Sequence, residues 1–440
     1  MNKRLLTFYR HVMFNLRGGF LVRPLIFTLA LGFAGTLLSG LEETFPQISR
    51  LTPSFLFPSD HDPALCQVIL STIASSMMTV VSIVFAILLM TLTLASMQYS
   101  PRILVAFVQD RVTQQTLGIF IGTFAYCVAA LPAARSVPHP FAPVTTVTGA
   151  MLLALACVVC LLFFIHHISQ AISVNHIVDR IARETEAIID AVTPHPIRQV
   201  RIAEPWNVTV PADEAPVLST VSGYVRYIDV ERLVSAAKLH HLVVRVVRRV
   251  GHFAPEGVAV AMASKQERLS AEAKSEILSS FDFGPTRTLQ QDVEFGILQI
   301  VDIALKAISP AVNDPSTAIN CIDHLGRILI RQGQRDPVDA LYYDPPGVLR
   351  LSVPWLRFDR LVESAFGQIR LYSQTDVAVS LRMMRALCDI AASVPMASDR
   401  ATLLAHGLKI LDGCTQALPD EDLSEMRARF ETLEANAARS

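Results

Sequence analysis

Residues 65–99 read LCQVILSTIASSMMTVVSIVFAILLMTLTLASMQY and contain no Asp, Glu, Lys or Arg. An α-helix needs about 20 apolar residues to cross the hydrocarbon core of a bilayer. This stretch is longer than one straight span, so we expect a helix over 68–97 that tilts or projects into water. The stretch therefore predicts that this part of the chain folds in lipid.

Three further stretches have the length and apolar character of a membrane span: residues 24–41, 116–134 and 143–165. Only 18% of the 440 residues are charged; charged side chains are scarce between Pro24 and Ile165 and appear every few residues from Asp179 onward. A typical soluble chain carries about 25% charged residues. The sequence thus predicts an α-helical multi-pass membrane protein with about four transmembrane helices in residues 24–167, followed by a water-soluble domain.

Basic residues at the ends of the spans predict the orientation, because Lys and Arg near a membrane helix stay in the cytoplasm. The loop after the first span is mainly acidic, with Glu42, Glu43, Asp60 and Asp62 beside Arg50. The N-terminal segment 1–23 is basic, with Lys3, Arg4, Arg10, Arg17 and Arg23. We therefore expect this segment and the C-terminal domain to be cytoplasmic, in a protein of the plasma (inner) membrane.

Bulk charge and cysteine placement disfavour several functions. The net charge is −1, which gives no support for a nucleic-acid partner. The cysteines lie in apolar or helical patterns, where they act as small packed hydrophobes, so we expect no metal and no cofactor. The sequence also lacks a Gly-rich phosphate loop, a nucleophile elbow and a zinc-type His/Glu pair. We therefore expect no catalytic residues and no enzyme activity.

Small and hydroxyl side chains form a stripe on one face of the second span. Such residues allow close helix packing in lipid. The same weakly polar face also suits the lining of a pore that is gated by an apolar constriction. Both interpretations stay open, although the lack of a charged residue mid-span disfavours a proton-coupled transporter. The stripe residues recur at spacings of three, four or seven: Ser71, Ser75, Thr79, Ser82, Ala86, Thr93 and Ser96.

The soluble part predicts an α+β fold. Residues 168–195 have the period of an amphipathic helix that continues the fourth span. Residues 217–264 alternate like strands separated by turn glycines, which predicts a small β-barrel or sandwich. The glycine spacing has a weak likeness to lipoyl or biotinyl carriers, but Lys238 lies in a predicted helix, so we expect no carrier role. Helical patterns dominate residues 270–440 and predict a helical layer.

A polar cluster is predicted in this helical region. Asp302 lies inside the apolar run IVDIAL, and a buried carboxylate needs a partner. Asp314 followed by Pro315 is typical of a helix start. The cluster is either a clasp that ties two helices together or a pocket for a ligand or a hard cation. Its residues are Arg287, Asp292, Asp302, Asn313 and Asp314.

Several phrases resemble a known family. They are LGIFIGTFAYC at 117–127, FFIHHISQAI at 163–172, and the segments around Ser96–Arg102 and Asn313–Ala318. The chain is similar in these phrases to the bacterial predicted-membrane-protein family called domain of unknown function 2254. The resemblance implies a multi-pass membrane protein with a cytoplasmic domain. It implies no established activity.

Two hypotheses of different classes follow. The favoured one is an oligomeric channel-like or transport-related protein, built from several copies of the chain in the lipid bilayer and gated by its cytoplasmic domain. The alternative is a membrane-anchored sensor or scaffold that conducts nothing. It would bind a ligand of unknown identity, or a partner, through its cytoplasmic domain near Asp302 and Asn313.

Overall fold

The computed structural model describes residues 22–45, 47, 62–98, 111–137, 140–171, 173–192, 213–335, 341–345 and 347–438. Residues 1–21 of the expected N-terminal segment and 193–195 of the expected connecting helix lie outside this range. The chain divides into two compact units, Met1–Ser173 and Val174–Ser440. We call them the membrane unit and the soluble unit.

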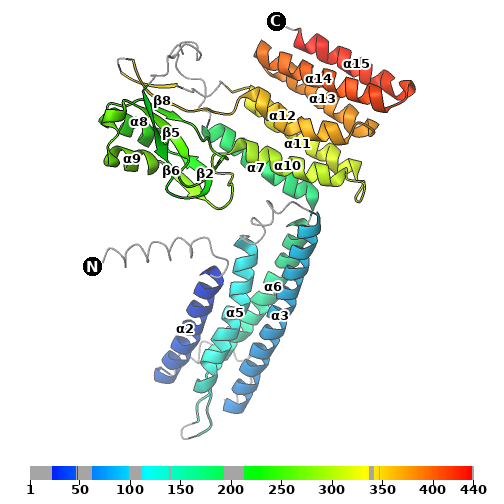
Figure 1. Ribbon diagram of the computed structural model, residues 1–440. Coiled ribbons are helices and arrows are strands. Elements are labelled where there is room, and N and C mark those ends of the chain that lie inside the picture. Colours follow the sequence, from blue (N-terminus) through cyan, green and yellow to red (C-terminus); the bar gives the residue numbers. More distant parts are fainter. Residues whose placement is uncertain are drawn as a thin grey trace. The chain divides into compact units, whose positions relative to one another are not determined.

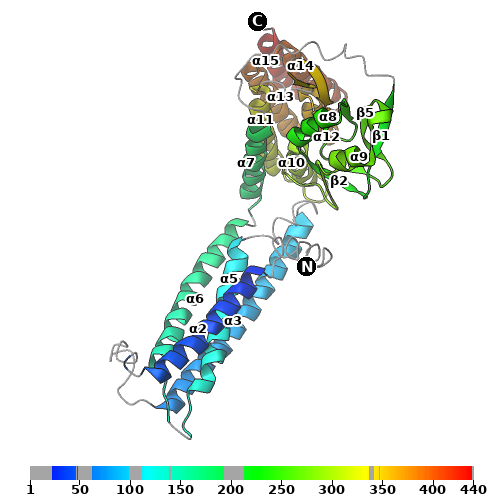
Figure 2. The same cartoon turned by 90° about the vertical axis from the view of Figure 1, so that its left-hand side faces the viewer.

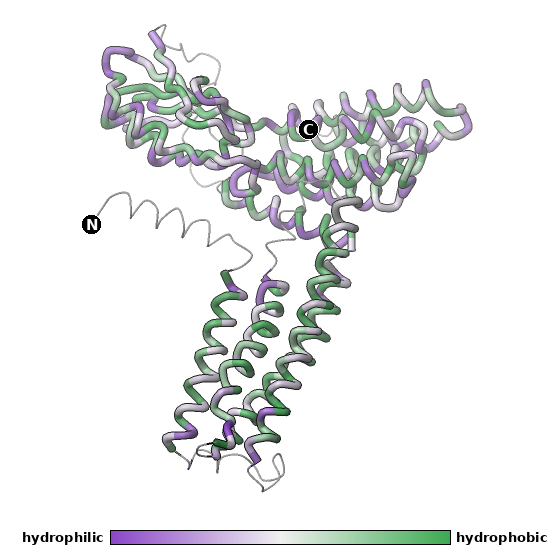
Figure 3. Tube along the Cα trace, turned by 60° about the horizontal axis from the view of Figure 1, so that its bottom comes forward, coloured by the Kyte–Doolittle hydropathy of each residue, from purple (hydrophilic) through white to green (hydrophobic). Residues whose placement is uncertain are grey.

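Four helices of the membrane unit are long and apolar enough to cross a bilayer. Figures 1 and 2 show them running along one another, and Figure 3 shows apolar residues along most of their length. The four predicted spans are therefore confirmed as apolar helices. They are α2 (Val22–Thr44), α3 (Pro63–Gln98), α5 (Arg111–Ala130, continued by the short η2, Leu131–Ala133) and α6 (Val144–Ala171).

Helix α5 is the most buried helix of the membrane unit, and it contacts α2, α3 and α6. Glycines bring it very close to α2. A Cβ added at Gly35 of α2 would lie 2.6 Å from the carbonyl oxygen of Tyr126 on α5. A Cβ added at Gly122 of α5 would lie 3.0 Å from the carbonyl oxygen of Phe27. Helices in lipid associate through such close packing, because lipid gives no hydrophobic driving force between them.

The β part of the soluble unit consists of two sheets. The larger sheet has the strand order β1-β5-β3-β8-β7, in which β3 and β8 are parallel and the other pairs are antiparallel. The smaller sheet is antiparallel and has the order β4-β2-β6. The strands are β1 (Glu214–Leu218), β2 (Gly223–Ile228), β3 (Val244–Val246), β4 (Phe253–Ala254), β5 (Ala259–Ser264), β6 (Phe281–Gly284), β7 (Leu341–Asp344) and β8 (Val348–Ser352).

Both sheets include strands from beyond residue 264, where the predicted β region ends. Strand β6 pairs with β2, strand β8 pairs with β3, and β7 extends the larger sheet beyond β8. Short helices connect the strands: α8 (Val230–Leu239), η3 (Gln266–Arg268) and α9 (Ala271–Leu278). Asp229 caps α8 by accepting a hydrogen bond from the backbone N–H of Arg232, 3.0 Å away. A small mixed-sheet region is thus present, and a barrel or sandwich shape stays a prediction.

The predicted helical layer begins after β6, and β7 and β8 interrupt it in the chain; Figure 1 shows its helices side by side. Asp314 caps α11 as predicted, because its carboxylate accepts from the backbone N–H of Thr317 at 3.1 Å and from the Thr317 hydroxyl at 2.6 Å. The layer contains α10 (Val293–Ala307), α11 (Pro315–Gly333), α12 (Phe358–Tyr372), α13 (Val377–Ser393), α14 (Ala397–Ala417) and α15 (Asp420–Ala437).

The expected extension of the fourth span is a separate helix. Helix α6 ends at Ala171, and α7 (Val174–Val192) belongs to the soluble unit. Helix α7 is amphipathic: it buries Ile177, Ile181 and Ile189, and it contacts α10 and α11. Its polar side carries carboxylates that pair with arginines of α11, for example Glu186 with Arg327 at 2.8 Å. Apolar burial and ion pairs therefore fix α7 on the helical layer.

A buried histidine in this layer predicts a pH effect. His406 of α14 is 5% exposed, and burial lowers its pKa from 6.5. Its Nε2 lies 3.4 Å from a Glu363 oxygen, and Lys409 and Arg370 are the neighbouring cations. Because the unfolded chain takes up the proton first, stability falls as pH drops through about 6.5. We expect His406→Gln to reduce the loss of melting temperature between pH 7.5 and 5.5.

The control for this prediction is His241→Asn, since His241 is exposed. This variant should keep the pH slope of the natural chain in the same melting experiment. An unchanged slope in the His406→Gln protein would contradict the assignment. The slope should not vanish, because burial also lowers the pKa values of His252 and His324.

Candidate functional site

The small and hydroxyl stripe lies on the uncovered face of α3 within its unit. Ser71, Ser75, Thr79, Ser82, Ala86 and Thr93 are all exposed, and the side chain of Ser96 lies outside the described residues. The opposite face packs inward and buries Ala74, Met77, Val84 and Thr91. The stripe is therefore not used for packing inside the bundle of one chain.

The hydroxyl groups of the stripe bond to their own helix. The Thr79 hydroxyl donates to the carbonyl of Ser75 at 3.2 Å, the Ser82 hydroxyl to Met78 at 2.9 Å, and the Thr93 hydroxyl to Leu89 at 2.8 Å. A hydroxyl has one proton and two lone pairs, so each group can still accept a hydrogen bond from another molecule. The stripe is weakly polar without an unsatisfied donor at these positions.

Glu42 is a buried carboxylate, although we predicted that it lies in a loop. It lies in the last turn of α2 and is 1% exposed. Its oxygens accept from the backbone N–H groups of Thr145 and Thr146 at 2.7 and 3.0 Å, and from the Thr146 hydroxyl at 2.9 Å. Glu42 therefore caps the first turn of α6, where a negative charge is favoured. The adjacent Thr145 and Thr146 at the start of α6 were the feature of the sequence that could have indicated this contact.

The five residues of the predicted polar cluster do not form one site. Arg287 and Asp292 lie at the N-terminus of α10, whereas Asn313 and Asp314 lie beyond its C-terminus. A helix of 15 residues is about 22 Å long, so the two groups are far apart. Asp302 is only partly buried within α10, not deeply buried as expected. The cluster was inferred because its residues are near one another in the sequence. Helix α10 separates them in space, since they lie at its two ends.

A buried ion-pair network surrounds the N-terminus of α10. Arg287 donates two hydrogen bonds to Asp292, at 2.8 and 2.9 Å, and one to Glu294 at 3.1 Å. Arg249, from the segment between β3 and β4, donates to the same Glu294 oxygen at 3.2 Å. Asp292 also caps α10 by accepting from the backbone N–H of Phe295 at 3.0 Å. Arg249 and Glu294 were not among the residues predicted for the cluster.

A tight turn at Gly251 packs against this network. Gly251 has φ +86°, which favours glycine, and a Cβ there would lie 2.5 Å from Asp292 and 2.7 Å from Arg287. Burial raises the pKa of Asp292 against the opposing effect of Arg287. Burial also tends to raise the pKa of Glu294. The charges and hydrogen bonds of Arg249 and Arg287 have the larger effect, so the pKa of Glu294 is lowered. The network thus contains two acids and two guanidinium groups with matched charge.

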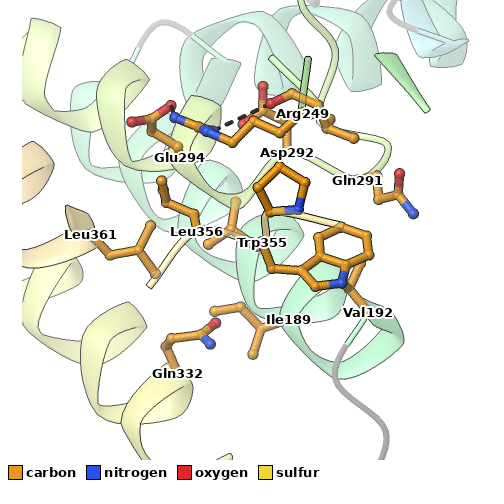
Figure 4. A pocket seen from close by; sticks show the side chains of 13 residues that line it. Ile189, Val192, Arg249, Gln291, Asp292, Glu294, Gln332, Trp355, Leu356 and Leu361 are labelled. Atoms are coloured by element: carbon orange, nitrogen blue, oxygen red, sulfur yellow. Dashed lines mark hydrogen bonds and ion pairs between the residues drawn. The ribbon is translucent and has the colours of Figure 1, made fainter. Parts of the chain in front are cut away.

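A pocket of about 60 Å³ borders this network. Figure 4 shows the Arg249–Glu294 ion pair at one end of the pocket and Gln332 of α11 at the other. Among the described residues no group of three His, Cys, Asp or Glu could hold a metal ion. The pocket is a candidate ligand site. Its lining comprises Ile189, Val192, Arg249, Val250, Gln291, Asp292, Val293, Glu294, Gln332, Pro354, Trp355, Leu356 and Leu361.

Comparisons with known proteins agree with the apolar helices. The family described as "Predicted membrane protein (DUF2254)" matches residues 17–389. The uncharacterized proteins Rv1290c of Mycobacterium tuberculosis and Mb1321c of Mycobacterium bovis are each 29% identical over 359 residues. The matched part is 80% of this chain and 69% of each relative, and neither name states an activity. No solved structure matches the chain.

Proposed function

This chain belongs to the DUF2254 family of predicted membrane proteins, and from that premise we propose that it is a homo-oligomeric, channel-like protein. In this proposal the stripe of α3 from each copy borders a central pathway. The soluble unit assembles the oligomer and gates it. The observation that carries the proposal is the exposure of the small and hydroxyl face of α3.

A comparison with the other helices supports this use of α3. The exposed faces of α2 and α6 carry large apolar side chains that suit lipid, such as Phe33 at 67% and Phe163 at 70% exposure. The exposed surface of α3 also includes large apolar side chains, such as Leu89 at 51%, but the stripe adds the exposed hydroxyl groups of Thr79 and Ser82 to it. Small residues favour contact with another helix over contact with lipid. The stripe therefore fits a contact between copies or a hydrated path better than a lipid-facing surface.

The orientation is part of the proposal. The N-terminal segment is basic, and Arg180 and Arg183 follow closely after α6. Positive residues next to membrane helices stay on the cytoplasmic side. We therefore place both termini and the soluble unit in the cytoplasm, with the four apolar helices in the plasma membrane.

The test is ion flux through the purified full-length chain in liposomes. Ser82→Leu places a large apolar side chain on the stripe, and we expect it to reduce flux about tenfold through steric and dewetting effects. Ser76→Leu is the matched control, because Ser76 is exposed on α3 beside the stripe rather than on it. Its flux should stay within about twofold of the natural chain. Equal effects of the two substitutions would contradict the pathway.

A second candidate is favoured by the pocket beside the buried ion-pair network. In this alternative the protein is a membrane-anchored sensor or scaffold, and its soluble unit binds a ligand without any conduction. Well-folded oligomers that carry no flux with any ion, while the pocket binds a molecule, would favour this candidate over the channel.

A further inference from the structure

We propose that the pocket at the N-terminus of α10 binds a small, neutral, planar molecule, namely a single aromatic or heteroaromatic ring with a hydrogen-bonding edge. A cavity needs a volume of roughly 10–15 Å³ to hold one water molecule. The pocket of about 60 Å³ therefore has room for several water molecules, and a single ring is the size of ligand that we propose for it. Ligand pockets are commonly apolar with a few polar groups that orient the ligand.

The apolar wall of the pocket is suited to a flat ring. Trp355 is held in place because its indole N–H donates to the Tyr342 hydroxyl at 3.1 Å. Pro354 and Leu356 flank it, and Ile189 and Val192 from the last turn of α7 complete the wall. Aromatic rings pack favourably on such a fixed aromatic side chain.

The charges around the pocket disfavour a charged ligand. Arg249 and Arg287 already pair with Glu294 and Asp292, and the side chains of the two acids are only 17% and 3% exposed. A cation would compete with a guanidinium for these carboxylates, and an anion would compete for the arginines. Either would be desolvated without a free partner, which is costly. A neutral molecule leaves the network intact.

Gln332 supplies the polar group. Its side chain lines the pocket, half-buried, and has no hydrogen-bond partner among the described residues. A primary amide offers both donors and an acceptor. It can therefore form a reciprocal pair of hydrogen bonds with an amide or a similar edge on the ring. A bound molecule would also touch α7, the helix that follows α6 in the chain.

The test compares three probes of equal shape on the full-length protein in lipid nanodiscs. Benzamide is neutral, benzamidine is a cation and benzoate is an anion. Saturation-transfer NMR should show benzamide binding at least about tenfold tighter than either charged probe, because only the neutral one avoids the desolvation cost. Equal binding of the three probes, or no binding of benzamide, would overturn the proposal.

Two pocket variants and one control variant locate the site. Val192→Trp fills the pocket and should abolish benzamide binding, whereas Leu371→Trp adds the same side chain at an exposed position of α12 and should not. Gln332→Leu should weaken benzamide about tenfold at an unchanged melting temperature, which keeps the test valid if Val192→Trp fails to fold. Benzamide binding that survives both pocket variants would refute the assignment. This assay reports binding alone, so it is independent of flux.

A fluorescence measurement tests independently whether benzamide binds next to Trp355. The chain has two tryptophans, Trp206 and Trp355, so Trp206→Phe leaves Trp355 as the sole emitter. Benzamide should shift or quench this emission over the same concentration range as the NMR signal. Emission that stays constant at saturating benzamide would place the probe elsewhere and overturn the proposal.

Discussion

Replacing Asp292 with alanine is expected to lower the free energy of unfolding of the soluble unit by about 3–5 kcal/mol. The carboxylate is almost completely buried, with 3% of its side chain exposed. It accepts two hydrogen bonds from Arg287 and one from the backbone N–H of Phe295. Its loss leaves a buried guanidinium with only Glu294 as partner and removes the cap of α10. Removing one member of a buried pair costs far more than the pair contributes, because the other charge remains desolvated.

Asp282→Ala is the matched control for this prediction. Asp282 also pairs with an arginine, Arg226, at 2.9 Å, but its side chain is 46% exposed. Exposed ion pairs contribute about 0–1 kcal/mol, so this variant should remain close to the natural chain. The exchange rate of the backbone amide hydrogens of α10 in the full-length protein measures the effect of each variant. A similar increase in exchange rate for the two variants would show that loss of the buried Asp292 carboxylate destabilises the fold no more than loss of the exposed Asp282 carboxylate.

The membrane helices could be predicted from the sequence because their signal is local. Lipid requires a continuous apolar run, and the residues that meet this requirement are neighbours in the chain. The start of α11 was predictable for the same reason. Asp314 and Pro315 act within one turn, on the backbone N–H of Thr317.

The candidate site could be predicted only in part because its contacts are not local. Asp292 and Arg287 were both named in the predicted cluster, but the hydrogen bonds between them were not predicted. Arg249 was missed, because its partner Glu294 is 45 residues away and no periodic pattern relates them. Glu42 was missed for a similar reason: its acceptor role depends on Thr145, 103 residues later. Asp302 was misjudged, since an acid within an apolar run can still lie at the edge of the buried face.

The pairing of strands shows the same limit. Strand β8 lies in the region that we predicted to be mainly helical, and its parallel partner β3 lies about a hundred residues earlier in the chain. Alternation within a strand reports which face is buried and contains no information about the neighbouring strand. The helices between β3 and β8 make this pairing possible, because a parallel connection needs a long crossover.

Replacing Gly35 with valine is expected to cost the membrane unit about 3 kcal/mol, through overpacking of the contact between α2 and α5. A Cβ at this position would lie 2.6 Å from the carbonyl oxygen of Tyr126 and 3.2 Å from its Cα. These are backbone atoms, so no rotamer change can relieve the clash. The two helices must separate, and the nearby contact of Gly122 with Phe27 is lost with them.

Gly40→Val provides the control on the same helix. Gly40 has no neighbour within 4 Å of an added Cβ, so the variant carries the same change in helix propensity without the clash. The fraction of folded protein during titration with a denaturing detergent should therefore fall at a lower concentration for Gly35→Val than for Gly40→Val. Equal midpoints would mean that α2 is not fixed by contact with α5. In that case α2 would be free to take a different position in an oligomer, and the exposed face of α3 would no longer be the part of the bundle best suited to meet another copy.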